Sequence, residues 1–134
     1  MKTKRKANEF VISYCVMSSD EDQIVVEDLI VGINANAELI VRVEHNDYED
    51  ARYNCSTQAV VSEDNARKLS RRLNVPLIKL PRFISDFMCD WGEMVNAGCV
   101  DVQACFSDIL ERLLDEGCKF RIKRQPGFCG HICC

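Results

Sequence analysis

The sequence contains little proline, glycine, histidine and tryptophan: three, six, two and one of them in 134 residues. So little proline and glycine excludes a collagen-like or low-complexity chain. No apolar run approaches the ~20 residues that cross a bilayer as a helix, so we expect no contact with a membrane. The chain also lacks a glycine-rich phosphate loop and a nucleophile elbow. No motif therefore indicates an enzyme, and we expect neither catalytic activity nor a cofactor.

The rest of the composition is that of an ordinary globular protein. Hydrophobic residues make up 47 % of the chain and charged residues 28 %. A chain of this length buries about two thirds of its unfolded surface when it folds, which is enough for a hydrophobic core. We predict a single domain over residues 1–134, with a basic N-terminal tail at 1–8 and a cysteine-rich C-terminal tail at 125–134.

Apolar and polar residues alternate through the first half of the chain, which predicts β-strands. The alternation is clearest at 10–17 and 38–45, a mostly apolar, β-branched run covers 24–33, and a shorter strand follows at 57–61. Gly32, Asn34 and Asn36 lie within 32–37, which favours a tight turn between the second and third strands. These strands predict a hairpin within an antiparallel sheet.

The spacing of apolar residues becomes helical after Ser62. This serine is a good N-cap for a helix over 63–74, which begins with two acids where the helix dipole favours them. Pro81 suits the first turn of a second helix over 81–96.

A third helix is predicted over 101–116, between an N-cap at Asp101 and a stop at Gly117. The last strand, over 118–124, carries basic side chains on one face, as suits an edge strand. Strands followed by helices indicate an α+β fold, in which an antiparallel sheet is covered on one face by about three helices. The expected helical contribution to the core is Phe83, Phe87, Trp91, Phe106, Ile109, Leu110 and Leu113.

Charge is segregated along a chain whose formal net charge is only −4. Residues 67–82 hold six basic side chains and no acid, and these are the candidate binding residues: Arg67, Lys68, Arg71, Arg72, Lys79 and Arg82. The stretch 69–75 resembles the first helix and turn of a helix-turn-helix, which implies contacts with nucleic acid. A recognition helix needs polar side chains, however, and this chain has Leu77, Ile78 and Pro81 there. A surface helix whose basic side chains cover acidic neighbours fits the segment better than a DNA-binding helix does. Between these two interpretations stands a third, in which the segment binds an anionic partner protein.

The nine cysteines are many for this length, but their odd number does not suit a framework of disulfides. The basic start and the apolar stretch after it are interrupted by Asn8 and Glu9, and no cleavage site for a signal peptide follows. We therefore expect a reducing cytoplasm rather than secretion. Five cysteines are then predicted to be small buried hydrophobic side chains: Cys15, Cys55, Cys89, Cys105 and Cys118.

The C-terminal tail combines Cys129, His131 and Cys133, which are ligand types for zinc at short spacing. A closed tetrahedral site needs a second pair of ligands, and no C-x-x-C pair exists elsewhere to supply it. We predict that no metal is bound, and keep a structural metal site in the tail as an alternative.

Acid–base chemistry has few candidates in this sequence. His45 lies on the apolar face of its strand, and we expect it to be partly buried and hydrogen-bonded rather than catalytic. Glu27 and Asp28 interrupt an apolar strand. Because adjacent residues of a strand point to opposite faces, they indicate a bend or bulge rather than a shared carboxylate site.

The expected function is that of a small cytosolic interaction or regulatory protein without catalytic activity. Its partner would be another protein, or a second copy of the chain in a homodimer. The alternatives are a nucleic-acid-binding regulator that uses the basic segment 67–82, and a metal-binding protein that uses the C-terminal tail.

Overall fold

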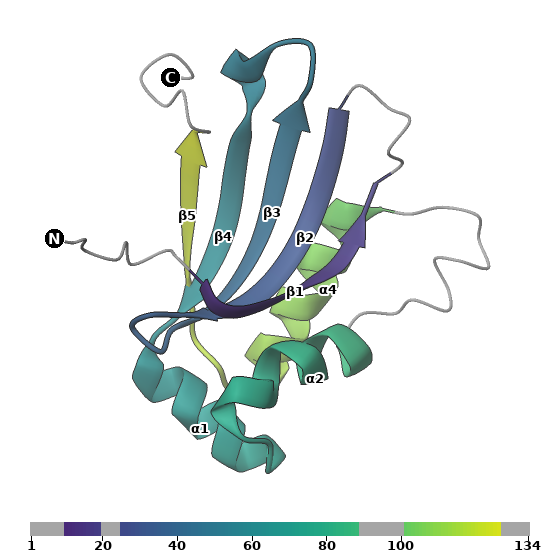
Figure 1. Ribbon diagram of the computed structural model, residues 1–134. Helices are drawn as coiled ribbons and strands as arrows, with labels where there is room; N and C mark the ends of the chain where they lie inside the picture. The colour runs from purple at the N-terminus through teal and green to yellow at the C-terminus, as the bar shows by residue number, and fades with distance from the viewer. Residues whose placement is uncertain (1–9, 20–24, 89–100, 127–134) are drawn as a thin grey trace, which may run out of the picture.

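The computed structural model describes residues 10–19, 25–88 and 101–126, which form an antiparallel sheet packed against helices (Figure 1). The strand order is β1-β2-β3-β4-β5, so strands that follow one another in the sequence are also neighbours in the sheet. The α+β prediction is confirmed, and β5 is an edge strand as expected. The strands are β1 (Phe10–Ser18), β2 (Val25–Asn34), β3 (Leu39–Asp47), β4 (Cys55–Val61) and β5 (Arg121–Pro126).

The start of α1 and both ends of α4 lie at residues whose chemistry the sequence already indicated. Ser62 Oγ accepts a hydrogen bond from the Asn65 amide at 3.3 Å, and Asp101 Oδ1 accepts one from the Ala104 amide at 3.0 Å. Gly117 has a φ of 78°, the left-handed conformation that ends a helix. The helices are α1 (Glu63–Leu73), α2 (Leu80–Phe87) and α4 (Val102–Asp115), with 3-10 turns η1 (Ala51–Tyr53) and η2 (Leu77–Lys79).

The core lies between one face of the sheet and the helices. Helix α2 packs on β1 and β2, and α4 packs on β2 and β3. Of the predicted core residues, Phe106, Ile109 and Leu113 are buried, and Phe83 and Leu110 are partly buried against the core. Helix α2 ends at Phe87, so the unbroken helix predicted over 81–96 was wrong, and Trp91 lies outside the described residues. Within the described part, no helix is long and apolar enough to cross a membrane.

The two ends of the sheet carry different parts of the chain. The segment between β3 and β4 lies at the upper end of the sheet in Figure 1, and α1 and α2 lie at the lower end. Because β4 runs from the upper end to the lower end, α1 begins directly below it. Helix α4 descends behind the sheet, and β5 then returns along the free edge of β4.

Gly32 was assigned to the turn on its sequence, and this was wrong. It lies within β2, opposite Ser13 of β1. A Cβ at this position would meet Phe10 Cδ1 at 2.5 Å and the carbonyl oxygen of Ile12 at 2.6 Å, so the glycine admits a close approach of β1. On the face of the sheet that no helix covers, the Arg42 guanidinium lies 4.6 Å from the centre of the Phe10 ring, a distance typical of a cation–π contact. In the turn itself, Ala37 takes the positive φ of 61°.

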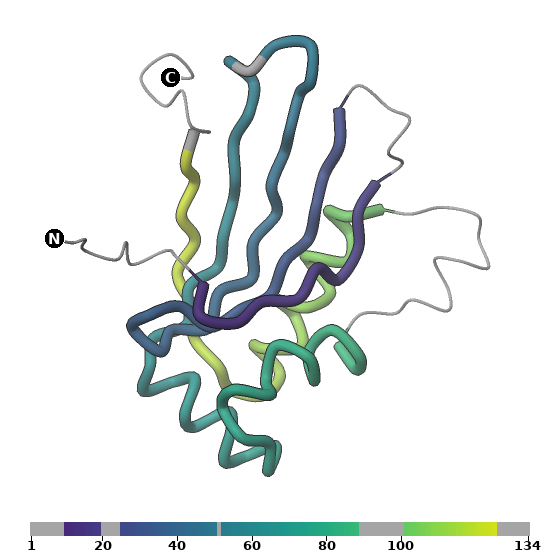
Figure 2. Tube along the Cα trace, viewed as in Figure 1, coloured from purple at the N-terminus to yellow at the C-terminus, as the bar shows by residue number. Residues whose placement is uncertain are grey.

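The bulge expected at Glu27 and Asp28 was also wrong. The register between β2 and β3 is unbroken, and the irregularities lie in β1, between Phe10 and Ile12 and between Cys15 and Met17. Figure 2 shows that β1 is the strongly bent strand, which agrees with the bending that bulges produce.

Candidate functional site

The predicted basic segment does not form an unbroken positive surface. All six side chains are exposed, but four are paired with acids. Three pairs lie on the same helix, namely Arg67 with Glu63 at 2.8 Å, Lys68 with Asp64 at 3.2 Å and Arg82 with Asp86 at 3.7 Å. The fourth joins Arg72 of α1 to Glu116 at the end of α4 at 2.8 Å. Within the described residues, only Arg71 and Lys79 of the six have no ion-pair partner.

A hollow lies between the helices at the lower end of the sheet. It has a volume of about 240 Å³ and lies between the end of α1, the outer side of α2 and the last turn of α4. We call it the helical groove. Four apolar side chains and three charged ones line it: Leu73, Phe83, Phe87, Met88, Arg112, Asp115 and Glu116.

The aromatic part of the helical groove comes from α2. The rings of Phe83 and Phe87 have centroids 4.9 Å apart in a tilted arrangement, a favourable geometry for an aromatic pair. Phe87 is 65 % exposed, so its prediction as a core residue was wrong. The apolar arc of α2 is wider than its contact with the sheet: Leu80, Ile84 and Met88 are buried, and the two phenylalanines lie beside them. That excess width was the signal that sequence analysis missed.

The charged part of the helical groove comes from α4. The Arg72–Glu116 pair links α1 to the end of α4 across one side of it. Arg112 and Asp115 are exposed and form no ion pair with any described residue. They stand three positions apart in α4, and so offer one positive and one negative group at the border of an apolar hollow.

His45 belongs to a second polar cluster, on the helix-covered face near the other end of the sheet. Its Nδ1 lies 3.3 Å from Glu27 Oε2, which also accepts a hydrogen bond from Gln103 Nε2 at 3.0 Å. His45 is therefore half-buried and hydrogen-bonded, as predicted, and the cluster joins β2 and β3 to the first turn of α4. Cys55 is opposite His45 in the register of β3 and β4, but no described hydrogen bond joins the thiol to the ring.

The prediction of buried cysteines is confirmed for Cys105 and Cys118 and wrong for Cys15 and Cys55. Cys15 and Cys55 are exposed free thiols rather than buried ones. Cys118 is buried, and burial raises the pKa of its thiol to about 11. Cys105 is fully buried but disulfide-bonded, so it is not the free hydrophobic thiol that was expected. Cys89 lies outside the described residues.

The predicted metal candidates Cys129, His131 and Cys133 lie outside residues 10–19, 25–88 and 101–126, as does the predicted N-terminal tail. The first two residues of the predicted C-terminal tail, Gln125 and Pro126, belong to β5. Inside those ranges, no three histidine, cysteine, aspartate or glutamate side chains come together as metal ligands.

Comparison of the chain with models of protein families, with curated proteins and with solved structures finds no match.

Proposed function

We propose that this chain is a protein-binding domain, and that the helical groove receives one apolar side chain from a partner polypeptide. The observation that carries the proposal is Phe87, a large aromatic side chain that is 65 % exposed at the border of a hollow of about 240 Å³. Phe87 continues the apolar lining formed by Phe83 and Met88, and charged side chains border it. A contiguous apolar surface with a polar rim is typical of an interaction site. Aromatic side chains in such pockets often dominate the energy of an interface.

The size of the helical groove favours a side chain over a free small molecule. Pockets for small ligands usually enclose about 300–1,000 Å³, and the groove has about 240 Å³. A cavity of about 150 Å³ holds a benzene-sized group. The groove thus has room for one aromatic or leucine side chain of a partner, and the rest of the contact would spread over the helices around it.

The charges around the helical groove indicate what should flank that side chain. Arg112 suits an acidic group of the partner and Asp115 a basic one, because each would otherwise face water without an ion pair in the described structure. The expected partner segment is therefore amphipathic, with one apolar anchor and charged neighbours of both signs.

The basic segment supports a nucleic-acid interaction less well. Binding to phosphates depends on uncompensated lysine and arginine, and four of the six side chains are paired with acids. A cytosolic location stays a prediction of the sequence.

The test is selection from a random peptide library displayed on phage, with the full-length protein as bait. We expect peptides with an aromatic or leucine anchor to be enriched, and their synthetic forms to lose at least tenfold in affinity towards Phe87→Ala. Leu114→Ala is the matched control, because Leu114 is also exposed on a helix but does not line the groove. Thermal unfolding of both variants checks that they remain folded.

Two results would overturn the proposal. One is a library that yields no enriched peptide on the wild-type protein. The other is a set of peptides that bind the Phe87 and Leu114 variants equally well, which would place the contact outside the helical groove.

A further inference from the structure

The segment that joins β3 to β4 presents two aromatic side chains to solvent. Tyr48 is 74 % exposed and Tyr53 is 61 % exposed. They lie in the connection between Asp47 and Cys55, at the end of the sheet opposite the helical groove (Figure 1). We call this connection, residues 47–54, the tyrosine loop. It is independent of the groove and of the function proposed for it.

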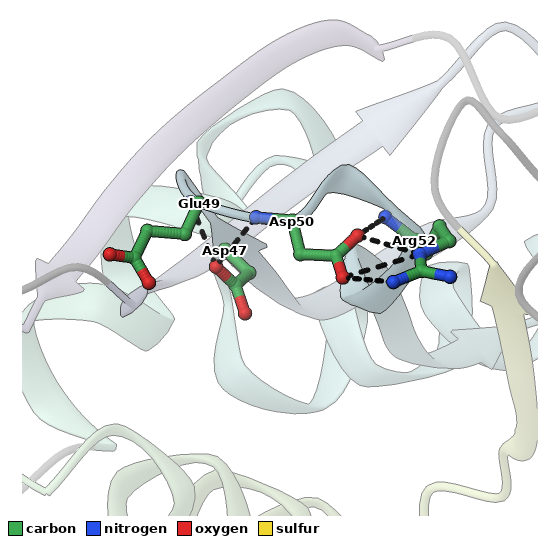
Figure 3. A network of polar contacts seen from close by, with 4 residues as sticks. All are labelled: Asp47, Glu49, Asp50 and Arg52. Carbon is green, nitrogen blue, oxygen red and sulfur yellow. Dashed lines mark hydrogen bonds and ion pairs between the residues drawn. The ribbon is translucent and has the colours of Figure 1, made fainter.

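The first half of the tyrosine loop is fixed by hydrogen bonds to the side chains of its own residues (Figure 3). Asp47 Oδ1 accepts from the amides of Glu49 at 2.9 Å and Asp50 at 3.1 Å. The amide of Asp47 donates to Asn54 Oδ1 at 2.7 Å, which connects the two ends of the loop. The backbone around Tyr48 is thereby ordered before any partner arrives.

The second half is fixed by a two-pronged ion pair. Arg52 Nη2 donates to Asp50 Oδ2 at 2.7 Å, and Arg52 Nε donates to Asp50 Oδ1 at 2.9 Å (Figure 3). The hydrogen bonds and charge of Arg52 hold the pKa of Asp50 below its usual value. The amide of Tyr53 also donates to the carbonyl oxygen of Asp50 at 3.0 Å, so the second tyrosine is placed by the same turn.

An ordered loop with exposed tyrosines has the composition of a binding surface. Tyrosine offers a large rigid contact at a low cost in side-chain entropy. A loop that is already ordered loses less conformational freedom on binding than a flexible one. The hydrogen bonds therefore lower the entropy that this loop loses on binding, as a rigid scaffold does for a recognition loop.

The charge of the tyrosine loop selects the kind of partner. The positive charge of Arg52 is neutralised by Asp50, which leaves the carboxylates of Asp47 and Glu49 as net negative charge. Glu49 is exposed and forms no ion pair with any described residue. A cationic side chain would gain an ion pair with Glu49 and could also lie against a tyrosine ring, which attracts cations through its face.

We propose that the tyrosine loop is a second docking surface, and that it binds a lysine- or arginine-bearing segment of a partner polypeptide. With the helical groove at the other end of the sheet, the domain would hold two partners, or two parts of one partner, without competition between them.

The experiment measures fluorescence anisotropy with a labelled twelve-residue peptide of alternating arginine and glycine, and with its glutamate counterpart. We expect the arginine peptide to bind the full-length protein and the glutamate peptide not to bind. Replacing both Tyr48 and Tyr53 with alanine should weaken binding at least fivefold. Glu49→Gln should weaken it about threefold and make it less dependent on salt.

Glu111→Gln is the control for charge, because Glu111 is exposed on α4 far along the chain from the loop. Val11→Ala is the control for lost apolar surface, since Val11 is exposed on β1. The proposal is wrong if either control weakens binding as much as the loop variants do, or if the tyrosine variant binds the arginine peptide like the wild type. Phe87→Ala, which tests the helical groove, should leave this binding unchanged.

Discussion

Replacing Gly32 with alanine tests the close approach of β1 to β2 on the helix-free face. The added Cβ would lie 2.5 Å from Phe10 Cδ1 and 2.6 Å from the carbonyl oxygen of Ile12. The phenyl ring ends a side chain and can turn aside, but the carbonyl belongs to the backbone of a paired strand. Overpacking of this kind costs about 1–3 kcal/mol. Without the clash, Gly32→Ala would stabilise the protein, because glycine within a strand is roughly 0.5–1 kcal/mol less stable than alanine.

Urea denaturation followed by circular dichroism shows whether Gly32→Ala raises or lowers the free energy of unfolding. We expect Gly32→Ala to lower the free energy of unfolding with an unchanged dependence on urea. In a Phe10→Ala background the loss should be smaller but should persist, because the Ile12 oxygen remains in place. The difference between the two backgrounds gives the coupling between Phe10 and Gly32. A neutral or stabilising Gly32→Ala in the wild-type background would refute the close approach.

Three further predictions concern the helices and the thiols. Asp101→Ala should lower the stability by about 1 kcal/mol and Asp101→Asn by much less, since asparagine keeps the N-cap acceptor; thermal unfolding compares them. Leu113→Ala should cost about 2–5 kcal/mol because Leu113 is fully buried, whereas the exposed Leu114→Ala should change stability by less than about 0.5 kcal/mol. Iodoacetamide at pH 8 should modify Cys55 in the native protein but not Cys118, whose pKa is raised to about 11 by burial; peptide mass spectrometry identifies the sites.

Local chemistry made much of the fold predictable. Helices begin at the side chains of Ser62 and Asp101, and one ends at Gly117, which has no side chain to oppose a positive φ. Each of the three was placed correctly from the sequence. Alternation located β1 and β3 because a half-buried strand must alternate, and a β-branched apolar run located β2. These features depend on residues that are only a few positions apart in the sequence, and they can therefore be recognised from the sequence alone.

The candidate sites depend on contacts that span the chain, and these were missed. Phe87 was predicted to be buried because it shares an apolar arc with Ile84, yet α2 meets the sheet with only part of that arc. The Arg72–Glu116 pair joins residues 44 positions apart. Gly32 was assigned to a turn because glycine is common there, whereas its neighbour in space is Phe10. Periodicity identifies an apolar side of an element but does not say which element covers it.

The ion pairs of α1 give a final test of how the basic segment behaves. Glu63 and Asp64 lie 2.8 Å and 3.2 Å from Arg67 and Lys68. Changing them to Gln and Asn removes two acids and leaves two cations uncompensated at the start of the segment. We expect the variant to be retained longer than the wild type on heparin, with a steeper dependence on salt.

The matched control removes the same charge elsewhere, by changing Asp108 and Glu111 of α4 to Asn and Gln. If overall charge alone decided retention, the two variants would elute together. Because pairing acts over a few ångströms and is screened beyond about 10 Å at 0.1 M salt, the α1 variant should elute later than the α4 variant. Equal elution would mean that the local acids do not mask the basic segment, and the argument against nucleic-acid binding would lose its basis.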